Sequence, residues 1–239
     1  MSRPRSSGAL RAVIITLLVV AALVVGADRL AAWWVGREMT NQLTSAARQH
    51  GGDLDGASVT IHGFPFLTQL LDGGDLDHVS ARLAAGTFGG FQVRDVVVDA
   101  RGLEPLDPFT VETANVTALL PFAAVEGLIA EQVGAAVSLS DAGGGNLRLT
   151  TSLAGFDVGA IVAPTARPHA IDIAVVNFVI AGATVGADSL PPGVGGHFVG
   201  LSVPLQLPTG ITLVAAGATP GGLSIAAQGR NIALANLAF

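Results

Sequence analysis

Residues 59–86 read VTIHGFPFLTQLLDGGDLDHVSARLAAG, and this stretch carries the strongest fold signal of the chain. Apolar and polar side chains alternate over residues 58–62 and again over 78–83, which is typical of strands with one buried face. Between them, residues 64–71 are predicted to form a short helix, with Pro65 in its first turn, where a missing N–H is tolerated. The stretch therefore predicts two strands joined by a short apolar helix.

This predicted helix gathers large apolar side chains in a chain that is only 5% aromatic. They are Phe64, Phe66, Leu67, Leu70 and Leu71. Such residues either fill a protein core or contact an apolar ligand. The local pattern leaves both interpretations open.

Most of the remaining chain also has the two-residue alternation of strands. Residues 91–101 show a mixed phase that indicates a β-bulge, and residues 141–146 (DAGGGN) are predicted to be a hairpin turn. Apolar residues alternate over residues 201–208, and the two prolines on the other face, Pro204 and Pro208, favour an edge strand. Residues 119–134 are predicted to be a second main helix with an apolar stripe.

About ten strands and two main helices are predicted, which gives an α+β fold class. We expect a strongly curved antiparallel sheet or an open barrel.

The first main helix is predicted over residues 28–49. Its apolar positions recur at helical spacing, at Ala32, Val35, Met39, Leu43 and Ala46. A helix packed on a sheet, or a stalk, is favoured over a helix lying on a membrane surface, because the polar face is not basic.

The N-terminus combines a basic flank with an uncharged apolar run. Arg3, Arg5 and Arg11 precede residues 12–27, which fits an export signal or a signal anchor. Both remain open. Residues 1–27 are therefore predicted to be a signal peptide or membrane anchor, and residues 28–239 an exported domain on the periplasmic side of the cytoplasmic membrane, in the cell envelope.

Composition excludes several functional classes. Hydrophobic residues make up 50% of the chain and charged residues 13%, whereas about 25% charged is usual for soluble proteins. The absence of cysteine excludes a disulfide scaffold, a thiolate metal site and a cysteine nucleophile. The net charge of -6, with no lysine, argues against nucleic-acid binding.

No catalytic or metal-binding set stands out in the sequence, so neither an enzyme, a metal nor a cofactor is predicted. The motifs HExxH and GxSxG are absent. Asp72, Asp75, Asp77 and His78 fit a turn better than a calcium loop. Asp95 and Asp99 share a predicted strand face but lack the aromatic platforms expected of a glycosidase.

Several segments together resemble one known family. They are GFPFLTQ (63–69) within residues 59–86, VVVDARGL (96–103), ALLPFAAVEGLI (118–129), and residues 203–234. On these segments the chain resembles the LmeA-like phospholipid-binding family of actinobacterial cell-envelope proteins. The GFPFLTQ block is the most specific of them.

This resemblance implies a non-enzymatic protein that binds phospholipid, of anionic or inositol type, and supports maintenance of envelope lipids and glycolipids. It also implies a fold like that of the tubular lipid-binding proteins, with a helix packed in a curled sheet. Acyl chains would then lie in an apolar groove or tunnel. The predicted lining is Phe64, Phe66, Leu67, Leu70, Leu71, Leu119, Leu120, Phe122, Val125 and Ile129, with Arg82 and Arg94 near the headgroup.

Two other functions remain as alternatives. One is a membrane-anchored scaffold protein of the envelope, and the other is an enzyme acting on lipid or glycan. The identity of the lipid and the oligomeric state are not predicted.

Overall fold

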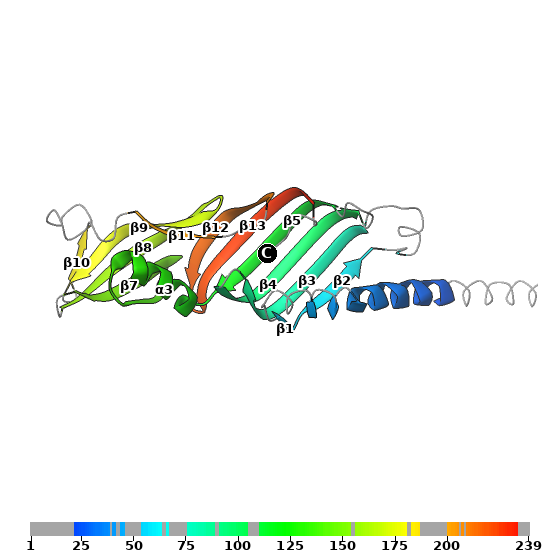
Figure 1. The fold of residues 1–239 in the computed structure, drawn as a ribbon, viewed down its shortest axis with the longest axis horizontal. Helices are drawn as coiled ribbons and strands as arrows, with labels where there is room; N and C mark the ends of the chain where they lie inside the picture. Colours follow the sequence, from blue (N-terminus) through cyan, green and yellow to red (C-terminus); the bar gives the residue numbers. More distant parts are fainter. Residues whose placement is uncertain are drawn as a thin grey trace, which may run out of the picture.

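The described part of the protein, in a computed structural model, contains two antiparallel sheets, helix α3 (Phe122–Val133) beside the smaller sheet, and an N-terminal helix (Figure 1). The structure describes residues 22–38, 40–41, 44–45, 54–63, 66, 76–88, 91–104, 110–153, 156–180, 183–186, 200–205, 207 and 209–233. Within this part of the chain, the predicted α+β class is confirmed.

The large sheet has seven strands in the order β1-β3-β4-β5-β13-β12, and β2 also pairs with β3. Its strands are β1 (Leu54–Asp55), β2 (Ser58–His62), β3 (Leu76–Phe88), β4 (Phe91–Glu104), β5 (Thr110–Leu120), β12 (Ile211–Thr219) and β13 (Gly222–Ala233). The strands predicted from the alternation at 58–62 and 78–83 are β2 and part of β3, which pair with each other as expected.

The small sheet has six strands in the order β10-β9-β8-β7-β6, and β11 also pairs with β9. Its strands are β6 (Val137–Gly143), β7 (Asn146–Leu153), β8 (Phe156–Arg167), β9 (Ala170–Ile180), β10 (Ala183–Gly186) and β11 (Leu201–Pro204). The predicted hairpin turn at 141–146 joins β6 to β7. Counting both sheets, the described residues form thirteen strands rather than about ten.

The predicted edge strand is confirmed as β11 but is shorter than residues 201–208. Its last pair is Pro204 with Ala170, the first residue of β9. Because β9 begins there, no strand partner remains for the residues that follow. Leu205 instead donates its N–H to the carbonyl of His169 at 2.9 Å.

Helix α3 spans Phe122–Val133, so the predicted start at residue 119 is wrong. Leu119 and Leu120 belong to β5, where they pair with Ser224 and Leu223 of β13. Pro121 (φ -55°, ψ 145°) has no N–H to continue the strand ladder and begins the helix instead.

The N-terminal helix comprises residues 22–38, 40, 41, 44 and 45 within the described chain. It therefore continues through the boundary at 27 and 28 that the sequence suggested. Ala32 is buried and Val35 half-buried, so these two members of the predicted apolar face pack on the sheet. Met39, Leu43 and Ala46 lie outside the described residues. Among the residues that the structure describes, no helix has both the length and the apolar character needed to cross a membrane.

Two buried clusters form the core. The first cluster joins α3, the small sheet and the end of the large sheet near Leu120 and Leu223. The second cluster joins the N-terminal helix to the opposite end of the large sheet, near Leu76 and Leu103. Ile211 packs against both clusters and so links them.

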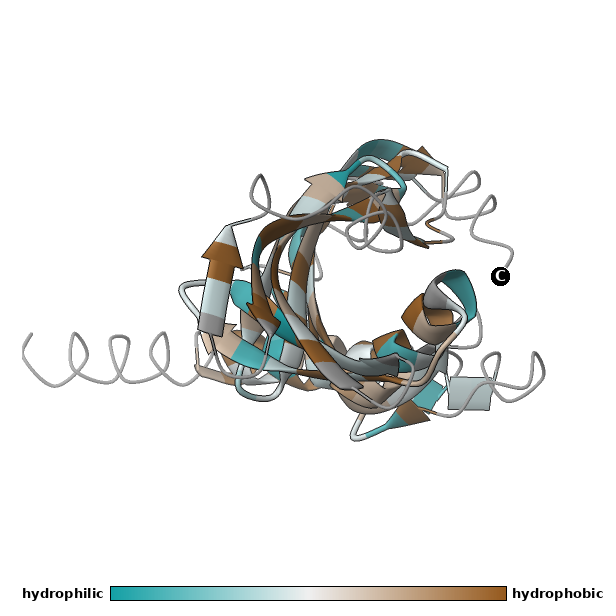
Figure 2. Cartoon of the chain, turned by 90° about the vertical axis from the view of Figure 1, so that its left-hand side faces the viewer, coloured by the Kyte–Doolittle hydropathy of each residue, from teal (hydrophilic) through white to brown (hydrophobic). Residues whose placement is uncertain are grey.

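The two sheets meet along β12. Leu213 donates its N–H to the carbonyl of Pro168 at 3.0 Å, and Ala218 donates to the carbonyl of Gly145 at 2.9 Å. Both acceptors lie in hairpin turns of the small sheet. Seen end-on, the strands trace an arc with α3 on its concave side (Figure 2). The strands of the described residues do not close into a barrel.

Candidate functional site

The large sheet separates apolar from polar side chains on its two faces. Cross-strand neighbours form rows, and one row is wholly apolar: Ala81, Val98, Val116, Ala227 and Leu213. The adjacent row, one residue along each strand, is wholly polar: Ser80, Asp99, Asn115, Gln228 and Thr212. Because successive strand residues point to opposite faces, the sheet has one apolar face and one polar face.

The apolar face has a half-buried middle, which we call the apolar strip. It consists of Ala81, Val96, Val98, Val116, Ala118, Ala216 and Ile225. One end meets the first cluster at Val93, Leu120 and Leu223, and Val96, Val116, Ala216 and Ile225 of the strip also pack against that cluster. The other end meets the second cluster at Val79 and Ala100. The strip crosses five adjacent strands, a width of roughly 19 Å at about 4.8 Å per strand spacing.

A bulge in β4 shapes one end of the strip, and it confirms the mixed phase seen in residues 91–101. The register between β4 and β5 shifts between Arg94 and Val97, and Asp95 has a positive φ of 49°. As a result Val93 and Val96, three residues apart, both pack with the first cluster. The bulge also interrupts the alternation that placed Asp95 and Asp99 on one face.

The predicted lining residues around α3 are brought together, but to different depths. Leu120 is 2% exposed, and Val125 and Ile129 are fully buried in the first cluster. Phe122 is half-buried against that cluster. Leu119, one residue from Leu120 along the strand, is half-buried on the other face of the sheet.

Among the five predicted lining residues of the 64–71 helix, the structure describes Phe66. It is helical, as predicted, and 1% exposed within the second cluster. Phe64, Leu67, Leu70 and Leu71 lie outside the described residues. The two predicted lining sets are therefore represented at opposite ends of the apolar strip, by Phe66 at one end and the α3 residues at the other.

The two predicted headgroup arginines differ in their position relative to the apolar strip. Arg82 is exposed and alternates with Ala81 and Leu83, so it lies on the polar face of the sheet. Arg94 is exposed beside the β4 bulge, opposite Ala85. The register places them on adjacent strands, three positions apart.

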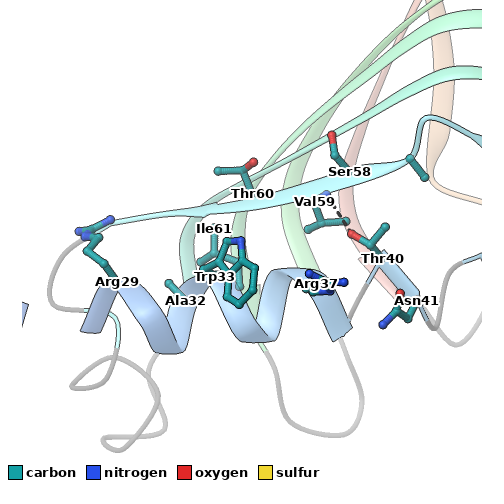
Figure 3. A pocket seen from close by; sticks show the side chains of 11 residues that line it. Arg29, Ala32, Trp33, Arg37, Thr40, Asn41, Ser58, Val59, Thr60 and Ile61 are labelled. Atoms are coloured by element: carbon teal, nitrogen blue, oxygen red, sulfur yellow. Dashed lines mark hydrogen bonds between the residues drawn. The ribbon is translucent and has the colours of Figure 1, made fainter. Parts of the chain in front are cut away.

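A groove of about 540 Å³ lies between the N-terminal helix and β2, and we call it the helix–β2 groove. Its walls are Arg29, Ala32, Trp33, Arg37, Thr40 and Asn41 of the helix and residues 57–61. Figure 3 shows β2 running along the helix, with Arg29, Trp33 and Arg37 following one another beside it.

Close packing fixes the two walls of this groove. A Cβ placed on the buried Gly36 would lie 2.9 Å from the carbonyl oxygen of Val59, so the backbones approach as only glycine allows. Thr40 Oγ1 accepts the Val59 N–H at 3.1 Å and donates to the Gly36 carbonyl at 2.9 Å. Arg29 Nη2 donates to the carbonyl of Gly63 at 2.7 Å.

The sequence interpretation missed this groove. Arg29, Trp33 and Arg37 recur every four residues, which places them on one stripe of a helix. This four-residue spacing is the feature of the sequence that indicates the groove. The polar face of the helix as a whole is not basic, so the average charge of that face hides the two aligned arginines.

The polar face of the large sheet carries a histidine pair. His62 and His78 stack with ring centroids 4.5 Å apart, and their Nε2 atoms contact Ser80 Oγ at 2.8 Å and Asp99 Oδ1 at 3.1 Å. Asp77 lies in β3 next to His78, whereas Asp72 and Asp75 are outside the described residues. In the described part of the chain, no three His, Asp or Glu side chains are grouped so as to hold a metal ion.

Comparison with known proteins adds a family. The family model for LmeA-like phospholipid-binding proteins matches residues 26–228. A search of the curated proteins and a search of the solved structures each found no match. The matched range starts in the N-terminal helix and ends in β13, so it includes the apolar strip and the helix–β2 groove. The chain belongs to the LmeA-like phospholipid-binding family.

Proposed function

We propose that this protein binds a phospholipid by laying an acyl chain along the apolar strip, while the headgroup remains in contact with water. The observation that carries the proposal is the unbroken apolar character of the strip across five strands, on a face whose two ends are closed by core clusters. A half-buried apolar surface of this kind favours contact with an apolar partner.

The dimensions and energies suit an acyl chain. The strip is roughly 19 Å wide, and one leaflet of a bilayer contributes about half of a hydrocarbon core that is about 30 Å thick. Burying each CH₂ contributes about 0.8 kcal/mol. A sixteen-carbon chain would therefore contribute on the order of 10 kcal/mol before the entropy cost of association.

The wider role that we propose is that of a non-enzymatic carrier or binding protein of the cell envelope, of the tubular lipid-binding type. The arc of strands around α3 supports a tubular arrangement (Figure 2). The basic flank and apolar run of residues 3–27 support export. The family supports a phospholipid as the ligand, and an anionic or inositol headgroup is part of the proposal.

The test compares two pairs of substitutions that exchange a methyl group and a hydroxyl on opposite faces. Val98→Thr with Val116→Thr makes the strip polar, whereas Thr113→Val with Thr117→Val alters the other face of β5. Native mass spectrometry after gentle purification measures the lipid-bound fraction. Since each buried hydroxyl without a partner costs about 1–3 kcal/mol, lipid uptake should fall at least tenfold for the first pair and stay unchanged for the second.

Two results would contradict the acyl-chain proposal. One is a lipid-free mass for the unmodified protein that persists after incubation with liposomes. The other is a folded Val98→Thr, Val116→Thr protein that retains lipid as well as the unmodified chain does. Circular dichroism and thermal melting establish whether each variant is folded.

A further inference from the structure

The helix–β2 groove holds two arginines at one edge of the large sheet. Asp28, whose carboxylate lies 3.9 Å from Arg29 Nη2, offsets part of their positive charge. Arg29 and Arg37 line it together with Trp33, and the Arg37 guanidinium lies 5.5 Å from the Trp33 ring centre in a cation–π contact (Figure 3). The exposed strand residues Ser58 and Thr60 add hydroxyl groups to the opposite wall. Two guanidinium groups with nearby hydroxyls form a donor set that suits a phosphate group.

The same helix exposes a continuous apolar surface beside the groove. Leu23, Leu30, Trp33 and Trp34 are 67%, 68%, 60% and 64% exposed. At 100° per residue Leu23, Leu30 and Trp34 share one stripe, and Trp33 and Arg37 lie between that stripe and β2. Large apolar residues exposed in a group mark an interaction surface.

The combination of side chains indicates the partner. Tryptophan prefers the boundary between hydrocarbon and headgroups, and arginine beside it reaches lipid phosphates. A protein partner is less favoured, because the arginines lie in a groove next to the apolar stripe rather than around it. The chain has a net charge of -6, so attraction to an anionic surface has to come from a local site such as this one.

We propose that the helix–β2 groove binds the phosphate of a phospholipid headgroup at the bilayer surface. Arg29 and Arg37 are the phosphate ligands, and Leu23, Leu30, Trp33 and Trp34 enter the interface. This site is separate from the apolar strip and does not require the strip to hold an acyl chain. It would orient the domain with the edge strand β2 toward the membrane.

Intrinsic fluorescence gives a direct measurement, because the chain has two tryptophans, both in this helix, and no tyrosine. The full chain is mixed with vesicles of phosphatidylcholine alone or of phosphatidylcholine with phosphatidylglycerol. Binding to neutral vesicles sets the baseline. We expect blue-shifted emission, quenching by brominated acyl chains, and tighter binding to the anionic vesicles that weakens with salt.

Charge-matched variants assign the preference to the groove. Arg29→Gln with Arg37→Gln is compared with Arg101→Gln and Arg148→Gln, which remove the same charge from β4 and β7. Each groove arginine should contribute about fivefold to anionic binding, since a basic residue near such a surface contributes roughly a factor of five. The first pair should lose on the order of 25-fold and the second pair should lose none.

The outcomes separate this site from the strip and from free phosphate. A preference for anionic vesicles that survives Arg29→Gln with Arg37→Gln would overturn the proposal. Tryptophans that stay unquenched when the unmodified protein is bound to vesicles would also overturn it, and this measurement needs no variant. Inorganic phosphate that shifts the emission where anionic vesicles do not would overturn the assignment to lipid. The Val98→Thr, Val116→Thr protein should keep its vesicle preference.

Discussion

Phe66 shows how a single buried side chain can decide between a core role and a ligand-contact role. It is 1% exposed and packs in the second cluster with Leu76, Leu103, Val111 and Ile232. Phe66→Ala should lower the free energy of unfolding by about 3–5 kcal/mol, as truncation of a buried phenylalanine usually does. Urea denaturation measures this loss.

Phe122→Ala is the matched control for Phe66, because its side chain is half-buried beside the first cluster. A smaller loss is expected there. If Phe66→Ala unfolds at the same urea concentration as the unmodified protein but loses lipid, Phe66 contacts ligand and is not part of the core.

Asp172 links three strands of the small sheet and gives a prediction about pH. The hydrogen bond from Arg167 Nε at 2.8 Å is the main cause that lowers the pKa of Asp172 below 3.8, and Ser202 Oγ at 3.2 Å adds to it. A lowered pKa in the folded state means that the interaction stabilises the fold above pH 3.8 and is lost as the pH falls through the lowered value. NMR titration of the carboxyl group should give a midpoint below 3.8.

Arg167→Gln tests the cause of this shift. The titration midpoint of Asp172 should move up toward its ordinary value, because the charged hydrogen-bond donor is removed. An unchanged midpoint in Arg167→Gln would contradict the assignment.

At the scale of single residues, the sequence identified side chains that matter but not their surroundings. Val125 and Ile129 were correctly placed on the apolar stripe of a helix, since spacing alone determines a stripe. Whether a stripe meets protein or ligand depends on the elements packed against it. For the same reason, the sequence did not predict that Arg37 lines a groove, because β2 forms the opposite wall of that groove.

At the scale of elements, two glycines of α3 form a matched pair. Gly134 ends the helix with a φ of 74° and donates its N–H to the carbonyl of Ala130 at 2.9 Å. Gly127 lies exposed inside the helix, and an added Cβ there would have no atom within 4 Å. Gly127→Ala should stabilise the protein by up to about 1 kcal/mol through helix propensity.

Gly134→Ala should have the opposite sign, with a loss of about 1 kcal/mol, because alanine resists the left-handed conformation. Thermal denaturation of both variants measures the difference. Equal melting temperatures would show that the end of α3 does not depend on this cap.

Element prediction succeeded where periodicity was strong. Alternation located β2 and much of β3, and the irregular phase of residues 91–101 correctly indicated the bulge in β4. Element prediction failed where the end of a strand depends on the neighbouring strand with which it pairs. Leu119 and Leu120 fit a helical stripe, yet pairing with β13 keeps them in β5, and β11 stops where β9 begins.

At the scale of the whole molecule, β12 joins the two sheets through backbone hydrogen bonds to two hairpin turns. The amide protons of Leu213 and Ala218 should therefore exchange slowly with solvent, although β12 is the last strand of the large sheet. Hydrogen–deuterium exchange measured by NMR tests this directly. Exchange as fast as in an unstructured peptide would show that the sheets separate readily in solution.

The sequence predicted the α+β class and the antiparallel character of the molecule, but not its division into two sheets. That division depends on contacts between residues far apart in the chain, such as Ala218 with Gly145 and Leu213 with Pro168. No local periodicity encodes such contacts. The resemblance carried by the GFPFLTQ block predicted the family correctly, but it did not predict the two sheets either.

The docking of hairpin turns on β12 also bears on how the protein avoids self-association. A terminal strand with free N–H and C=O groups is a template for intermolecular strand addition, and natural proteins suppress aggregation by covering such strands. Here Pro168 and Gly145 occupy positions that a strand from another chain would need. The contacts that hold the sheets together therefore also protect β12 from amyloid-like pairing, which is useful for a protein with so apolar a sequence.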